Sequence, residues 1–108
     1  MTEREGKLPK PPQTYRDFTA RYPDLAKAWE LVHKGGDAAG PLDEKTRRLV
    51  KLAIAVGAKQ EGAVHSSVRK GLAQGITREE MEQVVALAVS TLGFPATVAA
   101  FSWVRDVE

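Results

Sequence analysis

Apolar residues recur every three or four positions along most of the chain, which predicts helices. The first such stripe covers residues 15–32 and consists of Tyr15, Phe18, Tyr22, Leu25, Trp29 and Val32. Pro23 interrupts the stripe and predicts that a second helix begins there after a short first one. The glycine- and proline-containing stretch over 35–41 then predicts a loop that ends this helix.

The rest of the chain predicts four more helices, over about 43–57, 60–74, 77–92 and 95–106. Asp43 suits the N-cap of the first, and Gly75 suits the end of the second. Thr77 and Glu80 form a capping-box pattern that opens the third, and Pro95 suits the first turn of the fourth. Because no segment alternates with the period of a strand, we expect an all-α fold with about five to six helices.

The last two predicted helices are apolar around most of their circumference, over 81–92 and 96–104. A helix of this kind is usually buried on all sides. A chain of 108 residues has little room for two such helices. We therefore expect a homo-oligomer that forms through these C-terminal helices. A compact monomer with one central helical hairpin is the alternative.

Chain length and proline content suggest a simple organisation. Residues 1–13 contain three prolines and no periodicity, which is typical of a flexible N-terminal arm. Residues 14–108 are the right length for a single helical domain. The sequence has neither an apolar run long enough to span a bilayer nor a secretory signal pattern. The expected location is the cytoplasm, with no membrane partner.

Charge and cysteine content exclude several functions. The net charge is only +2, and basic residues alternate with acids, as in LDEKTRRLVK. This pattern is typical of a solvated surface, so no nucleic-acid partner is expected. The chain contains no cysteine, which excludes disulfides, thiolate metal sites and cysteine nucleophiles.

Glu61 and His65 are the candidate catalytic residues. At about 100° per residue, His65 lies about 40° from Glu61 on the helix, and Val68 and Leu72 lie about 20° to either side of Glu61. The pair therefore falls within the apolar stripe, and residues four apart can touch. Glu61 can orient the imidazole or act as a base, while His65 moves a proton. A purely structural hydrogen bond is the alternative interpretation.

Neither a metal nor another cofactor is expected at this pair. Glu61 and His65 supply only two ligands, and His33 is the chain's other histidine.

Four further residues are candidate substrate contacts. Thr46 lies on the apolar face of its helix, where it can line a pocket or bond to a carbonyl one turn back. Arg47 and Arg48 lie toward the opposite side, and Arg69 lies at the edge of the stripe one turn after His65. These arginines suit either a solvated surface or a contact with a substrate carboxylate.

Residues 41–101 resemble the core of the carboxymuconolactone decarboxylase and alkylhydroperoxidase D superfamily. The segments that carry the resemblance are LDEKTRRLVKLA, GFPA and the run HSSVRKGLAQGITREE that begins at His65. The resemblance implies an alkylhydroperoxidase D-like helical protomer with its active site near subunit contacts. It also implies a homo-oligomer, commonly a trimer or hexamer.

Within that superfamily, the peroxidase branch carries the pattern Cys-x₂-Cys-x₃-His. His65 matches the histidine, but Ala58 and Glu61 stand at the cysteine positions. The decarboxylases lack these cysteines and carry a glutamate four residues before the histidine, as this chain does. The resemblance therefore implies a thiol-independent decarboxylase or lactone-transforming enzyme that acts on a small carboxylate or lactone. A catalytically idle member that binds a ligand or serves as an oligomeric scaffold is the alternative.

Overall fold

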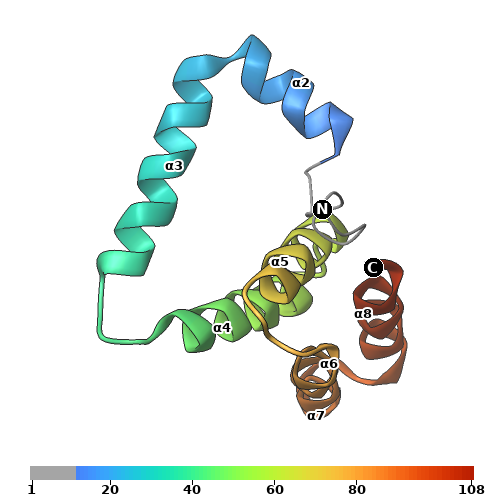
Figure 1. Ribbon diagram of the computed structural model, residues 1–108. Helices are drawn as coiled ribbons and strands as arrows, with labels where there is room; N and C mark the ends of the chain where they lie inside the picture. The colour runs from blue at the N-terminus through green and yellow to red at the C-terminus, as the bar shows by residue number, and fades with distance from the viewer. Residues whose placement is uncertain (1–11) are drawn as a thin grey trace, which may run out of the picture. The chain divides into compact units, whose positions relative to one another are not determined.

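A computed structural model describes residues 12–108 (Figure 1), so most of the predicted N-terminal arm lies outside the described residues. The helices are α2 (Gln13–Arg21), α3 (Pro23–Ala38), α4 (Glu44–Gly57), α5 (Glu61–Ala73), α6 (Arg78–Leu87), α7 (Val89–Leu92) and α8 (Phe94–Asp106). Residues 12–108 contain no strand, which confirms the all-α prediction. None of their helices has the length and apolar composition needed to cross a membrane.

The described chain divides into two compact units. Helices α2 and α3 belong to one unit, and the other comprises residues 44–108, from the start of α4 onward. The prediction of a single domain over 14–108 stays a prediction.

Helices α2 and α3 meet at Tyr22, and Pro23 stands in the first turn of α3 as the sequence predicted. The predicted loop over 35–41 was wrong at its start, because α3 continues through Gly35 and Gly36 to Ala38. A glycine inside a helix lowers its stability by only about 1 kcal/mol, which does not by itself end the helix. Neither helix contains a buried residue, so their apolar stripe is exposed.

The second unit encloses the hydrophobic core. Helices α4 and α8 each pack against both α5 and α6 (Figure 1). The buried apolar side chains come from all four helices and from the loop before α6: Leu52, Ala55, Val56, Val64, Val68, Ile76, Met81, Val85, Ala100 and Val104. Gly71 is buried where α5 meets α6. A Cβ atom at this position would lie 3.0 Å from the sulfur of Met81, so the two helices approach closely here because Gly71 has no side chain. This close approach holds α5, the helix that carries Glu61 and His65, against the core.

The predicted helix over 77–92 begins as expected but is divided. Thr77 and Glu80 form the capping box, which confirms that prediction. The helix then breaks at Ala88, whose N–H bonds to the carbonyl of Val85, three residues back. This tight turn ends α6, and the short α7 continues to Leu92.

Each of the two C-terminal helices leaves apolar surface uncovered in the single chain, and the expectation of an oligomer rests on this excess surface. Leu87, Phe94 and Val98 are 69%, 71% and 57% exposed. One face of each helix packs on the core, and these three side chains lie outside it. Oligomerisation through this apolar surface stays a prediction.

Candidate functional site

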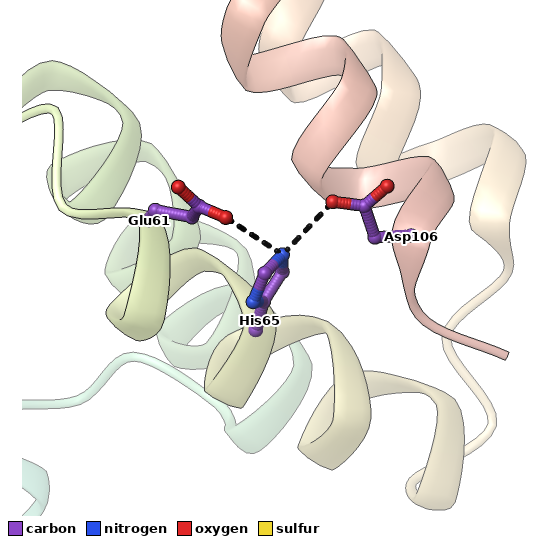
Figure 2. Close-up of side chains that lie close together, drawn as sticks. All are labelled: Glu61, His65 and Asp106. Carbon is purple, nitrogen blue, oxygen red and sulfur yellow. Dashed lines mark hydrogen bonds and ion pairs between the residues drawn. The ribbon is translucent and has the colours of Figure 1, made fainter.

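The turn between α4 and α5 places Glu61 at the start of α5. Lys59 adopts a left-handed conformation with φ of 58°, and the N–H of Gln60 bonds to the carbonyl of Ala55. This tight reversal lets α5 begin immediately at Glu61. His65 follows one turn later, on the side of α5 that faces α8 (Figure 2).

The structure brings a third side chain to the predicted pair. The Nε2 atom of His65 lies 3.3 Å from Oδ2 of Asp106, within hydrogen-bonding distance. The same nitrogen lies 3.9 Å from Oε2 of Glu61, which suits an ion pair but is too long for a hydrogen bond. Figure 2 shows the imidazole between the two carboxylates. We call these three residues the His65 cluster.

The His65 cluster is more open than the sequence predicted. The side chain of His65 is 25% exposed, but those of Glu61 and Asp106 are 55% and 56% exposed. The prediction of a buried Glu61 was wrong, because this residue lies in the first turn of α5 and its carboxylate is more than half exposed (Figure 2). Solvent and small molecules can therefore reach the carboxylates.

Asp106 was missed by the sequence analysis because it joins His65 only through the packing of α8 against α5. One local signal was available. A carboxylate in the last turn of a helix opposes the helix dipole, so its position at the end of α8 calls for a compensating positive charge. The imidazole of His65 faces it, and the guanidinium of Arg78 lies at the same helix end.

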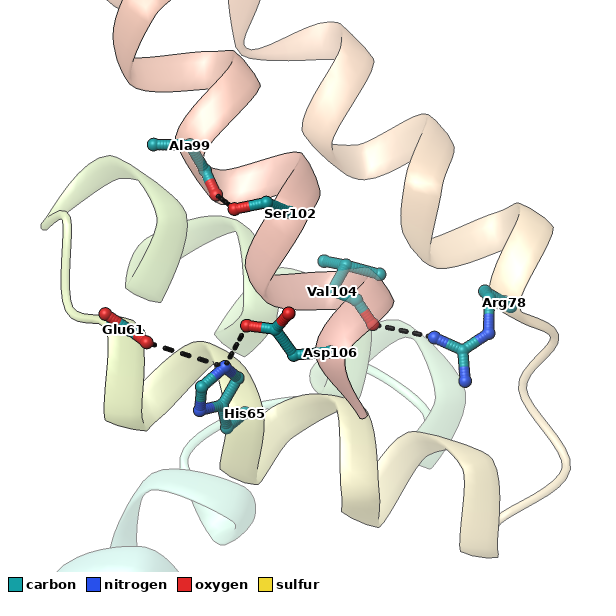
Figure 3. Close-up of polar contacts among 7 residues, drawn as sticks. All are labelled: Glu61, His65, Arg78, Ala99, Ser102, Val104 and Asp106. Atoms are coloured by element: carbon teal, nitrogen blue, oxygen red, sulfur yellow. Dashed lines mark hydrogen bonds and ion pairs between the residues drawn. The ribbon is translucent and has the colours of Figure 1, made fainter. Parts of the chain in front are cut away.

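Arg78, in the first turn of α6, anchors the end of α8 (Figure 3). Its guanidinium donates to the carbonyl of Val104 at 2.7 Å and also to the carbonyl of Val107. These bonds satisfy carbonyls that the end of a helix leaves open. Nearby in α8, the hydroxyl of Ser102 donates to the carbonyl of Ala99 at 2.6 Å. Arg78 thereby fixes the turn of α8 that presents Asp106.

The predicted substrate contacts are distributed more widely. Thr46 is exposed and lines a cavity of about 450 Å³ whose walls come from α4, α6 and α7 and do not include Glu61 or His65. Arg47 and Arg48 lie on α4 and are half-buried. Arg69 is half-buried on α5, one turn beyond His65. Of the four, Arg69 is nearest in sequence to the His65 cluster and shares its helix.

The His65 cluster can take part in two kinds of chemistry. With a proton on Nε2, the imidazole donates to Asp106, so the ring can take part in proton transfer. One donor atom from each residue also lies within 4.8 Å of the others, an arrangement that can hold a metal ion. Both possibilities centre on Nε2 of His65.

These features define a class: a helical protein with a histidine between two carboxylates and no thiol in its sequence. The sequence model of the carboxymuconolactone decarboxylase family matches residues 23–106, and the chain belongs to this family. The resemblance inferred from the sequence is thereby confirmed.

Two archaeal proteins are similar to the chain over most of its length. The uncharacterized protein MJ1511 of Methanocaldococcus jannaschii is 28% identical over 97 residues, which cover 90% of this chain and 91% of that protein. The uncharacterized protein MJ0742 of the same organism is 30% identical over 80 residues, which cover 70% of this chain and 74% of that protein. Neither name states an activity.

Proposed function

We propose that the protein is a thiol-independent decarboxylase or lactone-transforming enzyme that acts on a small carboxylate. Its membership of the carboxymuconolactone decarboxylase family supports this proposal. The observation that carries it is the position of His65, whose Nε2 lies 3.3 Å from Asp106 and 3.9 Å from Glu61. A histidine placed in this way can exchange a proton with a bound molecule.

In the proposed reaction, loss of carbon dioxide leaves an electron pair on the adjacent carbon, which must take up a proton. The imidazolium of His65 supplies that proton from Nε2. Asp106 and Glu61 lie on either side of this nitrogen and orient the ring. Because the ring is 25% exposed, water can return the proton afterwards.

A substrate carboxylate would be repelled by Glu61 and Asp106, so binding requires a positive group. We propose Arg69 for this role, since it follows His65 by one turn on α5. A guanidinium can hold a carboxylate through two parallel hydrogen bonds. Arg47 and Arg48 are further candidates on α4. We do not extend the role to Thr46, because its cavity is lined by neither Glu61 nor His65.

The thiol peroxidase activity of the related branch is not part of the proposal. That cycle requires cysteines that form and break a disulfide, and the 108 residues contain none.

Ligand-induced stabilisation tests the proposed function. A ligand that binds only the folded protein raises its melting temperature. We would screen lactones and dicarboxylates by thermal shift, followed by a carbon dioxide release assay on each hit. The wild type is compared with Glu61→Gln and His65→Ala, with Glu79→Gln as the control for loss of an exposed carboxylate.

A hit and turnover that persist in Glu79→Gln but disappear in His65→Ala would support the enzyme. No hit, together with variants of the pair that melt well below the wild type, would make the pair structural. The scaffold alternative would then stand.

We further propose that the protein forms a homo-oligomer, a trimer or a hexamer. The support is an exposed apolar stripe on α8, where Phe94, Val98 and Phe101 are 71%, 57% and 37% exposed. Their spacing places them on one face of the helix. Contiguous apolar surface of this kind is typical of a contact between proteins. The cytoplasmic location stays a prediction.

A further inference from the structure

We propose that Glu61, His65 and Asp106 bind one divalent transition-metal ion, in competition with the proton on Nε2 of His65. The three donor atoms come from two helices that pack directly against each other, α5 and α8, and lie within 4.8 Å of one another. The binding itself does not depend on the proposed reaction.

Both carboxylates face one ring nitrogen (Figure 2). A single N–H can donate well to only one of them, and the distances of 3.3 Å to Asp106 and 3.9 Å to Glu61 reflect this. The carboxylates also repel each other across the imidazole. A cation placed between the three donors contacts all of them and removes this repulsion.

The separations between the three donor atoms are close to those of a metal site. Metal–ligand bonds of about 2.0–2.2 Å in a tetrahedral site separate neighbouring ligand atoms by about 3.3–3.6 Å. The separation between His65 and Asp106 is already 3.3 Å. The Glu61 oxygen lies 3.9 Å from Nε2 of His65, and the three donor atoms lie within 4.8 Å of one another. The carboxylate of Glu61 must therefore move inward by about 1 Å to bring all three separations into this range. Its side chain is 55% exposed and is therefore free to make that adjustment.

The backbone around the cluster is held in place before any ion binds. Arg78 fixes the last turn of α8 through the carbonyls of Val104 and Val107 (Figure 3). On the other side, α5 packs against α4 and carries the buried Val64 and Val68. A site on rigid helices loses little conformational entropy when it binds an ion.

The ligand set favours Zn²⁺ or Co²⁺ over Mg²⁺ or Ca²⁺. Imidazole nitrogen suits the transition metals, whereas the hard cations prefer a shell made of oxygen. Three protein ligands would leave the remaining coordination positions to water. An ion on Nε2 takes the place of the proton, so Zn²⁺ should inhibit the reaction. This last consequence rests on the proposed function.

The direct test is metal titration of the full-length protein after treatment with EDTA. Zn²⁺ binding is measured by calorimetry and Co²⁺ binding by its visible absorption, both without substrate. We expect one ion per chain, and binding at least about tenfold weaker in His65→Ala and Asp106→Asn. His33→Ala removes the other histidine and should bind like the wild type.

Circular dichroism and melting curves establish that each variant is folded, and the near-isosteric Asp106→Asn serves if His65→Ala does not fold. Absence of micromolar binding by the wild type would overturn the metal site. So would binding that survives in folded His65→Ala and Asp106→Asn. Turnover in EDTA tests the proposed function separately, so an active protein that binds no metal refutes only this inference.

Discussion

His65 depends on two residues far away in the sequence, Asp106 and Arg78. Asp106 accepts the hydrogen bond of the ring, and Arg78 holds the helix end that presents Asp106. The Glu61–His65 pair is predictable because its members are one helical turn apart. The other two contacts arise from the packing of α8 against α5 and α6, so a local pattern can mark Asp106 as unusual but cannot identify its partner.

Replacing His65 provides the first prediction at the scale of single residues. If His65 transfers the proton, His65→Ala should lower kcat by about 10²- to 10⁴-fold on any substrate found by the screen. The melting temperature should change little, because the ring is partly exposed and lies outside the core. Ser66→Ala, at the next position, is the matched control. A kcat within threefold of the wild type would remove His65 from the proposed mechanism.

Arg78 provides a second prediction at this scale. A lysine keeps the charge but cannot span the two carbonyls as the planar guanidinium does. Arg78→Lys should therefore destabilise the protein by about 1–3 kcal/mol, the usual effect of losing one hydrogen bond of a charged group. Urea unfolding measures the change, and Arg105→Lys on exposed α8 surface is the control. Equal midpoints for Arg78→Lys and the wild type would show that Arg78 does not anchor α8.

Most elements were predictable because their signals are local. Pro23 and the Thr77–Glu80 capping box mark helix starts through their own backbone chemistry. The misplaced features lack such a signal. Ala88 is a residue type that favours helices, so nothing in the sequence predicts that α6 ends there. Gly35 and Gly36 remain helical because two glycines weaken a helix without ending it.

The capping box also predicts how stability depends on pH. The ion pair with Lys45, at 2.5 Å, is the main cause that lowers the pKa of Glu80 from 4.5 to about 2, and the backbone N–H of Thr77 adds to it. The folded protein therefore favours the ionised carboxylate. Its stabilising contribution is complete above pH 4.5 and is lost as the pH falls toward 2.

Glu80→Gln should therefore lose less stability than the wild type between pH 5 and pH 2, as measured by thermal unfolding at low salt. The difference should shrink at high salt, because the Lys45 and Glu80 side chains are 56% and 35% exposed. Glu79→Gln removes the neighbouring exposed carboxylate and should follow the wild type. Parallel curves for Glu80→Gln and the wild type would contradict the role of this ion pair.

At the scale of the whole molecule, the pattern of apolar residues predicts more burial than one chain provides. The core of the second unit uses one face of α6 and one of α8. Leu87, Phe94 and Val98 remain exposed on those helices. Helical periodicity identifies apolar positions, but it cannot state whether the same chain or another one covers them.

The final prediction uses this difference to test the proposed oligomer. Phe94, Val98 and Phe101 form the exposed stripe of α8, whereas Thr97 and Ala100 face the core. Val98→Asp places a charge in the stripe without entering the core, so the fold should survive while association weakens. Light scattering after size exclusion should show a trimer or hexamer for the wild type and smaller species for Val98→Asp. Ser90→Asp, at an exposed polar position of α7, is the control. A monomeric wild type would refute the oligomer, and an assembly unchanged by Val98→Asp would move the contact away from α8.

If Val98→Asp dissociates and also loses turnover, the catalytic site is completed across the subunit contact. Turnover retained by the dissociated chain would place the whole reaction within one protomer, at His65.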